Sequence, residues 1–452
     1  MSQQEVITEQ RTSNKESPTN TILESGTSPS LFLRKLFETA VDAALPYGNI
    51  DKYLPKDRTG KLVVIGAGKA AASMAQALEA SWEGMISGLV VTRYQHGAPC
   101  RYIEVVEASH PVPDDEGEKV AKRILGLVND LNENDNVICL LSGGGSALLS
   151  LPAPDIRFAE KQSINKALLK SGAAIDEMNC VRKHLSAIKG GRLAQAVYPA
   201  NMLTLAISDV PGDCADVIAS GPTVADPSTR FDAMNILKKY KIAVSNTVMQ
   251  WLESEASETP KYGDKKLTRS AFEIISTPMS SLLAAQEKSE SMGIPAYILG
   301  DSLEGEARDV AQVHGAMAIS AAKHDQPFPV PCVILSGGET TVTVRGKGRG
   351  GRNCEFLLSL YQALEKAPDV KDRIYAIACD TDGIDGVEDN AGAELKPEFY
   401  RATQALGLKP DSYLANNDSY GFFNALNALI LTGPTRTNVN DFRAILILPE
   451  AQ

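Results

Sequence analysis

The sequence predicts an α/β protein of two domains, each built on a mainly parallel sheet with helices between the strands. Short apolar runs alternate with helical patterns along the 452 residues, as in strand–helix–strand units. A polar, charged stretch at residues 254–270 separates two such series, and the length favours two or three domains. We therefore predict domains at residues 29–265 and 266–452, after a polar tail at residues 1–28 that we expect to be disordered.

The periodicity of apolar residues predicts each element in order. We expect helices at residues 31–45, 71–80, 116–131, 158–171, 231–254 and 353–364. We expect strands at residues 61–65, 88–91, 103–107, 137–141, 202–207, 272–275, 296–299, 332–335, 341–344, 374–379 and 444–448. Ligands of parallel α/β sheets bind beyond the carboxyl ends of the strands. The loops that follow the strands are therefore the places to look for a site.

Composition excludes several classes of function. Lys and Arg number 45 against 56 Asp and Glu, a net charge of −11, which argues against non-specific nucleic-acid binding. No apolar stretch reaches the roughly 18 residues of a membrane span. The seven cysteines form no CxxC pair and the five histidines are scattered, which favours free thiols in a reducing compartment over disulfides or zinc. We expect a cytoplasmic protein, and the sequence is compatible with a monomer or a homodimer.

The most informative loop follows the apolar strand at residues 137–141. It contains Ser142, Gly143, Gly144, Gly145 and Ser146 before residues that can open a helix. Glycines let a ligand approach the main chain closely, and a helix N-terminus behind them presents free N–H groups to an anion. We predict that these five residues bind phosphate or carboxylate, although a tight strand-to-helix turn without a ligand is the alternative.

A second glycine loop contains Gly66, Gly68 and Lys69. It resembles a weak dinucleotide fingerprint, but the acidic residue expected about 20 residues on is missing. Thr92 and Arg93 stand at that place. The lysine inside the loop favours binding of phosphate or carboxylate, and the alternative is a structural turn with a solvated lysine.

Basic residues concentrate in a third glycine-rich loop at residues 345–353, which carries Lys347, Arg349 and Arg352. Guanidinium groups bind phosphate oxygens through two parallel hydrogen bonds. Arg352 is the strongest candidate because it directly precedes a predicted helix. A mobile basic loop without a ligand is the alternative.

Carboxylates follow two of the predicted strands. Asp209 and Asp213 flank a Pro-Gly turn, and Asp380 and Asp382 flank a threonine. Such carboxylates can hold Mg²⁺ or orient a hydroxyl group, although local Asx turns would also explain them. With the three glycine loops, they indicate phosphoryl transfer between two domains. No Walker motif and no protein-kinase motif set is present, so we predict a small-molecule kinase of another lineage.

Many segments together resemble the glycerate 2-kinase family with a C-terminal MOFRL domain. In chain order they read IGAGKAAASMA, SHPVPD, LLSGGGSALLSLP, MNCVRKHLSAIKGGRLA, ISDVPGD, IASGPTV, LSGGETTVTV, GRGGRN, DTDGIDG and GPTRTNVND. The resemblance runs from about residue 31 to the C-terminus. It implies an active site in the cleft between two domains. It also implies phosphorylation of D-glycerate at the 2-hydroxyl with ATP and Mg²⁺, giving 2-phospho-D-glycerate.

The resemblance also implies roles for individual residues. The family's catalytic residues fall on Lys69, Asp209 and Arg352. The resemblance further implies ligand binding by Gly66, Gly68, the loop from Ser142 to Ser146, and Gly351 and Asn353 beside the arginine. We expect Arg182 or Lys183 to hold the glycerate carboxylate, and Asp382 and Glu339 to hold Mg²⁺. Cys214, Cys354 and Arg436 depart from the family pattern and leave the three catalytic positions intact.

Two other functions are weighed against the kinase. The first is an NAD(P)H-dependent reductase of hydroxypyruvate or tartronate semialdehyde, which the loop at Gly66 superficially permits. The missing ribose-binding acid and the basic loop argue against it. The second is a sugar-phosphate sensor without turnover, which needs neither Asp209 nor ATP hydrolysis.

Overall fold

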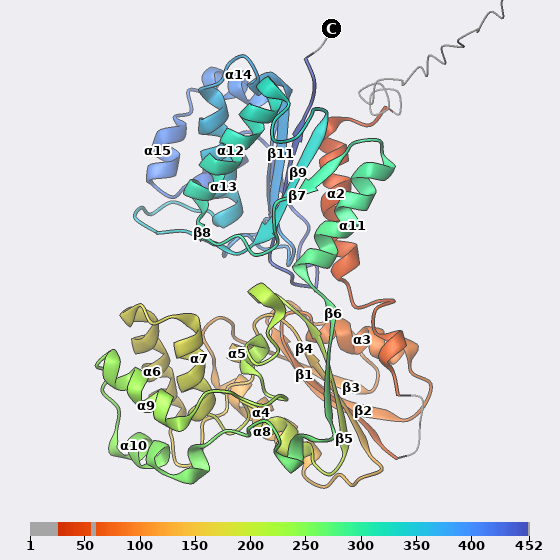
Figure 1. Cartoon of the computed structure of the whole chain (residues 1–452), viewed down its shortest axis with the longest axis vertical. Helices are drawn as coiled ribbons and strands as arrows, with labels where there is room; N and C mark the ends of the chain where they lie inside the picture. Colours follow the sequence, from red (N-terminus) through yellow and green to blue (C-terminus); the bar gives the residue numbers. More distant parts are fainter. Residues whose placement is uncertain (1–25, 56–59, 451–452) are drawn as a thin grey trace, which may run out of the picture.

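The computed structural model describes residues 26–55 and 60–450. Most of the tail that we expect to be disordered lies outside these residues. Figure 1 shows two lobes stacked along the long axis of the molecule, and each lobe is built on one six-stranded sheet. Among the described helices, none combines the length and apolar character that crossing a bilayer requires.

The first sheet is entirely parallel, with the order β3-β2-β1-β4-β5-β6. Its strands are β1 Leu62–Ala67, β2 Ile86–Arg93, β3 Ile103–Ala108, β4 Asn136–Leu141, β5 Asn201–Ile207 and β6 Ser270–Ser276. The chain builds outward from β1 in one direction and then outward from β4 in the other. Loops after β1 and β4 therefore diverge and leave a crevice, which is where ligands bind in such sheets.

Helices cover both faces of the first sheet, which explains why its strands are continuous apolar runs. On one face α3 Ala71–Ser81 packs Met74 and Leu78 against Val64 and Leu140. The other face is covered by α4 Asp115–Val128, α5 Gly145–Leu148 and α8 Arg192–Val197. A further group extends this lobe to the left in Figure 1: α6 Phe158–Ser171, α7 Ile175–His184, α9 Arg230–Lys239 and α10 Asn246–Glu253.

The second sheet is mixed, with the order β13-β12-β11-β14-β9-β7. Its strands are β7 Ala296–Ile298, β9 Cys332–Gly338, β11 Ile374–Asp380, β12 Gly392–Leu395, β13 Leu429–Ile430 and β14 Asp441–Ile447. Only β7 and β9 pair in parallel, and the other pairs are antiparallel. The expectation of a mainly parallel sheet is wrong here. Helices bury both faces, so the apolar runs look the same in either orientation.

The second sheet lies between two helical layers (Figure 1). On one face, α12 Ala307–His324 and α13 Arg352–Glu365 bury Phe356 and Tyr361. On the other face, α2 Pro29–Ala44 and α11 Pro278–Ser291 bury Phe32, Leu36 and Phe37. The remaining elements of this lobe are α14 Glu398–Ala405, α15 Pro410–Ala415, α16 Ser419–Ala425 and a small parallel ladder of β8 Gly305–Glu306 with β10 Thr340–Thr341. Short 3₁₀ turns occur at Asp51–Tyr53, Pro211–Asp213, Ile218–Ser220, Glu255–Ser257, Lys265–Leu267 and Lys371–Arg373.

The two sheets divide the chain differently from the predicted domains. Strand β6 pairs with β5 and completes the first sheet, although it falls after residue 265. Helix α2 packs on the second sheet, although it falls within residues 29–265. The chain crosses from β6 to α11 through Thr277 alone, which caps α11 with its side chain. The polar stretch at residues 254–270 is therefore a surface loop of the first lobe, and the chain crosses between the lobes later, at Thr277.

Candidate active site between the two lobes

The two predicted glycine loops meet where β1 and β4 end. Gly68 has φ +139°, and a Cβ added there would lie 2.1 Å from Oγ of Ser142. The N–H of Ala70 donates to that hydroxyl at 2.9 Å, and the N–H of Lys69 donates to the carbonyl of Gly143 at 2.8 Å. A Cβ on Gly66 would lie 2.3 Å from the carbonyl of Leu140. Close packing of the two loops therefore requires Gly66 and Gly68 even without a ligand.

Lys69 reaches from the first lobe into an acidic cluster of the second. Its Nζ lies 2.6 Å from Oδ2 of Asp382 in a largely buried ion pair. Burial lowers the pKa of Lys69, but the charges of Asp382, Asp380 and Asp209 outweigh burial and raise it above its usual value. Lys69 is therefore a fixed positive charge at the junction of the lobes.

Arg352 opens helix α13 and contacts three carboxylates at once. Its Nε lies 2.7 Å from Asp441, its Nη1 3.0 Å from Glu339 and its Nη2 2.8 Å from Asp380. The three carboxylates raise the pKa of Arg352 well above its usual value despite its burial. Burial and the neighbouring Asp382 raise the pKa of Asp380 well above its usual value. Arg352 thus holds the acidic cluster together as well as carrying charge into it.

Asp209 follows β5 and lies at the same junction. Oδ2 of Asp209 accepts a hydrogen bond from Nδ2 of Asn438 at 2.9 Å, and its carbonyl accepts one from Asn440 at 2.6 Å. Gly143 is required beside it, because a Cβ there would lie 2.1 Å from that carboxylate. Burial of the carboxyl group raises the pKa of Asp209 to about 6, although Lys69 acts in the opposite direction. Such a pKa suits a general base near neutral pH.

The two asparagines were not predicted as site residues. They are Asn438 and Asn440, in the segment at residues 433–441, which begins with Gly-Pro-Thr. Asn438 and Asn440 contact Asp209 from the opposite lobe, and Oγ of Ser73 donates to the carbonyl of Arg436 nearby. The asparagines were visible in the motif, but no local sequence pattern reveals a contact between residues more than 200 positions apart.

The acidic cluster can be tested for its fit to Mg²⁺. Within residues 26–55 and 60–450, no three His, Cys, Asp or Glu side chains gather into a group that could hold a metal ion. Mg²⁺ usually binds through one or two carboxylates together with phosphate oxygens and water. Asp382 and Asp380 are joined by a backbone hydrogen bond, and Glu339 reaches them through Arg352. The described carboxylates alone therefore do not form a complete Mg²⁺ site, and only one or two of them together with phosphate oxygens and water would match the usual donor set.

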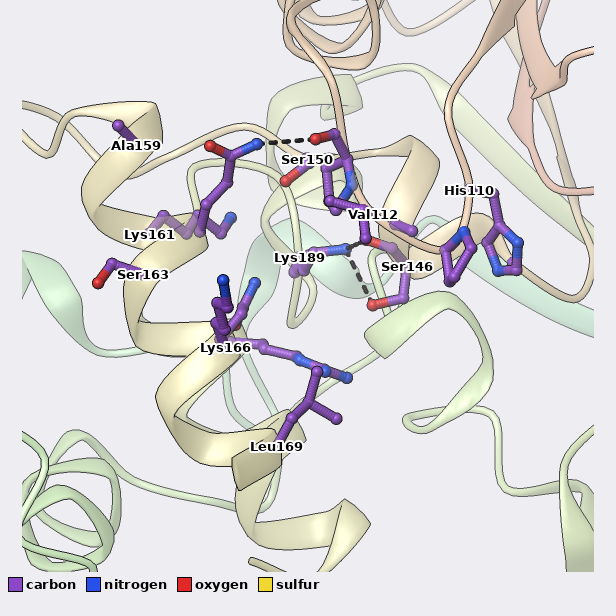
Figure 2. Close-up of a pocket in the computed structure, with 17 residues that line it drawn as sticks. His110, Val112, Ser146, Ser150, Ala159, Lys161, Ser163, Lys166, Leu169 and Lys189 are labelled. Carbon is purple, nitrogen blue, oxygen red and sulfur yellow. Dashed lines mark hydrogen bonds between the residues drawn. The ribbon is translucent and has the colours of Figure 1, made fainter. Parts of the chain in front are cut away.

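A cavity of about 860 Å³ lies in the first lobe beside the glycine loops. Figure 2 shows Lys161, Lys166 and Leu169 on α6 along one side, with Lys189 in the middle and Ser146 and His110 opposite. The lining residues are His110, Pro111, Val112, Pro113, Gly144, Ser146, Ala147, Ser150, Ala159, Lys161, Gln162, Ser163, Asn165, Lys166, Leu169, Arg182 and Lys189.

The edge of the cavity at Gly144 and His110 lies close to Lys69. A Cβ added to Gly144 would lie 3.0 Å from Cδ2 of His110 and 3.5 Å from Cγ of Lys69. Burial lowers the pKa of His110 to about 4, so its ring is neutral near pH 7. The cavity and the acidic cluster therefore adjoin on either side of the Lys69 side chain.

Several of the predicted binding residues make contacts within the protein. Arg182 lines the cavity, but Nζ of Lys183 lies 3.2 Å from both Asp216 and Asp226 in a largely buried ion-pair network. Asn353 is buried and donates to Asp441 at 2.8 Å, and Gly351 abuts Asp385 too closely for any side chain. These contacts give Lys183, Asn353 and Gly351 structural roles in the described chain.

The basic loop at residues 345–351 is tied down by its own lobe. Backbone N–H groups of Arg345, Lys347 and Arg349 donate to the side chains of Asn417, Asn416 and Asp418. The guanidinium of Arg349 pairs with Glu388 and stacks on Tyr420 at 4.2 Å. Of the cationic residues predicted in this loop, Arg352 alone reaches the acidic cluster.

Two family models match the chain over most of its length. A domain of unknown function, DUF4147, matches residues 32–253, and the MOFRL family matches residues 332–441. The two matches therefore supply the two sides of the site: Lys69 and Asp209 come from the first, and Asp382, Arg352 and Asn438 from the second.

Relatives of known name extend over both lobes. A protein of Agrobacterium vitis named "Putative hydroxypyruvate reductase" is 49% identical over 418 residues, covering 92% of this chain and 94% of that protein. The D-glycerate 2-kinase of Thermotoga maritima is 40% identical over 416 residues, covering 92% of this chain and 97% of that protein. The crystal structure of glycerate kinase from Thermotoga maritima has a TM-score of 0.83 at 40% identity and covers 92% of this chain and 98% of its own.

Proposed function

Because the chain belongs to the glycerate 2-kinase family with a C-terminal MOFRL domain, we propose that it phosphorylates D-glycerate at the 2-hydroxyl with ATP, giving 2-phospho-D-glycerate and ADP. One observation carries the proposal. Lys69, from the loop at the switch point of the parallel sheet, lies 2.6 Å from Asp382 of the other lobe and close enough to Asp209 to perturb its pKa. The first lobe thus supplies both the cation and the base that phosphoryl transfer uses, and the second lobe meets them with Asp382.

Asp209 acts as the base in this proposal. Its pKa of about 6 leaves it ionised at pH 7 and able to accept the proton of the 2-hydroxyl as the oxygen attacks phosphorus. Asn438 orients the carboxylate by donating to Oδ2. Lys69 neutralises negative charge on the phosphoryl group as it is transferred, which is the largest task in this reaction.

Arg352 supports the site from the second lobe. It positions Asp380 and Glu339, and its charge extends towards the place of transfer. Asp382 and Glu339, with Asp380 between them, would hold Mg²⁺ together with phosphate oxygens. When bound, Mg²⁺ supplies positive charge that offsets the charge of the phosphates.

A product assay tests the proposal. The purified protein is mixed with D-glycerate, ATP and Mg²⁺, and the product is passed to enolase either directly or through phosphoglycerate mutase. We expect a signal with enolase alone, because only the 2-phosphate is its substrate. A signal that requires the mutase would assign the 3-hydroxyl instead, and no ADP release would remove the kinase activity.

The reductase is a second candidate because of the name of the Agrobacterium vitis relative. The end of β2, where a ribose-binding acid would stand, holds Thr92 and Arg93. Oγ1 of Thr92 donates to the carbonyl of Lys69 at 3.3 Å and so supports the lysine loop. We expect that hydroxypyruvate causes no oxidation of NADH or NADPH, and the measurement is the absorbance at 340 nm. Turnover in that assay would favour the reductase.

A cytoplasmic location is part of the proposal. All seven cysteines are free thiols, and burial raises the pKa of the five buried ones, Cys139, Cys180, Cys332, Cys354 and Cys379. Buried thiols of this kind suit a reducing compartment.

A further inference from the structure

The cavity beside the glycine loops carries positive charge without a matching negative charge. Lys161, Lys166, Arg182 and Lys189 line it, and no acidic residue stands among its described lining residues. Lys161 and Lys189 are each only 2% exposed. Buried lysines are ordinarily paired with carboxylates, because the desolvation of an unpaired charge is costly. This cavity therefore lacks a counter-ion.

Lys161 and Lys189 are each held by the protein in a way that leaves N–H groups of Nζ free to donate. Nζ of Lys189 donates to the carbonyl of Ser146 at 2.5 Å and lies 3.3 Å from its hydroxyl. Nζ of Lys161 donates to the carbonyl of Leu151 at 3.0 Å. A protonated amine has three donors, so each lysine is anchored by the protein and keeps at least one proton for a ligand.

We propose that this cavity binds the polyphosphate chain of the nucleotide, with Lys161, Lys189 and Arg182 contacting phosphate oxygens and Lys166 at the rim. The proposal rests on the kinase function given above and assigns the nucleotide to the first lobe, away from the basic loop at residues 345–351. That loop is occupied by contacts with its own lobe.

Size and charge favour a nucleotide over glycerate in this cavity. A volume of about 860 Å³ is within the usual range for a cofactor or drug-sized ligand, whereas glycerate has only three carbons and one negative charge. Four cationic side chains match the charge of a triphosphate. Pro111, Val112, Pro113 and Leu169 add apolar lining suited to a base or a ribose.

The position of the cavity also fits in-line transfer. Its edge at Gly144 and His110 adjoins the stem of Lys69, and Lys69 leads to Asp382 and Asp209. A polyphosphate that begins at Lys161 and Lys189 would therefore present its terminal phosphate to the junction of the lobes. Glycerate would then approach from the side of Asp209 and Asn438.

Binding of an anion here should take up protons. Burial lowers the pKa of Lys161 to about 7, with Arg182 lowering it further and Glu118 raising it. Burial also lowers the pKa of Lys189 well below its usual value, with Lys161 and Arg182 acting in the same direction. At pH 8 the Lys161 amine is largely neutral, and a bound polyphosphate would favour the protonated form of both amines.

The experiment measures binding of ATP and of inorganic tripolyphosphate by isothermal titration calorimetry, without glycerate. We expect Lys189→Met and Lys166→Met each to weaken both ligands by about tenfold or more, since each removes a charge-assisted contact. In wild type at pH 8, titrations in two buffers of different ionisation enthalpy should reveal proton uptake. Lys189→Met should reduce that uptake.

Lys170→Met is the matched control, because Lys170 is an exposed lysine at the end of α6 that does not line the cavity. It should bind both ligands like wild type. Lys166 is itself exposed, so its variant is informative even if Lys189→Met fails to fold. Unchanged binding of tripolyphosphate in Lys166→Met would overturn the proposal.

The outcome is separate from that of the kinase assay. If the lysine variants weaken tripolyphosphate binding but the protein forms no phosphoglycerate, the polyphosphate site stands and the kinase function is rejected. If the protein forms 2-phosphoglycerate but the Lys166→Met and Lys189→Met variants bind ATP as tightly as wild type, the kinase function stands and this binding site is rejected.

Discussion

At the scale of single residues, Lys69 has both a structural and a chemical role, and the two can be separated. Lys69→Met should lower kcat by about 10² or more, because it removes charge stabilisation in the transition state. It also leaves Asp382 buried without its partner, which should lower the free energy of unfolding. The measurements are steady-state turnover and urea unfolding.

A second substitution distinguishes the two roles of Lys69. Adding Asp382→Asn to Lys69→Met removes the buried carboxylate that has lost its partner. The double variant should therefore regain the urea midpoint of wild type but not its turnover. Lys119→Met is a control on an exposed ion pair with Glu116 and should change neither quantity measurably. Near-normal turnover in Lys69→Met would remove this residue from the chemistry.

At the scale of elements, the turn after β1 depends on a glycine for packing. Gly68→Ala places a methyl group 2.1 Å from Oγ and 2.6 Å from the carbonyl of Ser142, at a φ of +139°. We expect a loss of about 2 kcal/mol or more in the free energy of unfolding. Gly126→Ala, on the exposed side of α4 with open space around it, should instead gain about 0.5–1 kcal/mol. Equal stability of the two variants in urea would contradict this account.

Much of the fold was predictable at the element scale because the local signals were strong. The central strands β1, β4 and β5 of the first sheet are mostly apolar runs, and all six strands of that sheet were predicted within a few residues. The antiparallel orientation of β11 and β14 was not, because helices cover both faces of that sheet and remove the alternation that marks antiparallel strands. Strands β12 and β13 were not predicted, since they are only four and two residues long.

The site was only partly predictable for a similar reason. Lys69, Asp209 and Arg352 stand in short motifs, and the structure brings their surroundings together at one junction. Lys161 and Lys189 could not be singled out, because a lysine in an amphipathic helix or before two glycines has the same local sequence whether it is solvated or buried. Burial is a tertiary property.

At the scale of the whole molecule, the second lobe influences the pKa of Asp209 in the first lobe. The pKa of Asp209 is raised to about 6 by burial, so activity should be present above that pH and fall as the pH drops through about 6. Asn438 of the second lobe donates to this carboxylate and favours its charged form. Asn438→Ala should therefore move the acidic limb of kcat/KM to higher pH.

The comparison that checks this coupling is a pH–rate profile of wild type, Asn438→Ala and the exposed-site control Asn424→Ala, which lies at the end of α16. The control should keep the wild-type limb. An unshifted limb in Asn438→Ala would mean that the opposite lobe does not set the protonation of Asp209.

The packing of α2 has a consequence for synthesis of the chain on the ribosome. Its apolar side chains Phe32, Leu36 and Phe37 are covered by α11, β9, β11 and β14, and the last of these strands ends roughly 400 residues later. At about 5–20 residues per second, helix α2 would wait roughly 20–80 s for its binding surface. During that time the nascent chain exposes an aromatic stripe, which makes it a natural client for a ribosome-associated chaperone. The enzyme's second lobe closes only when translation is almost complete.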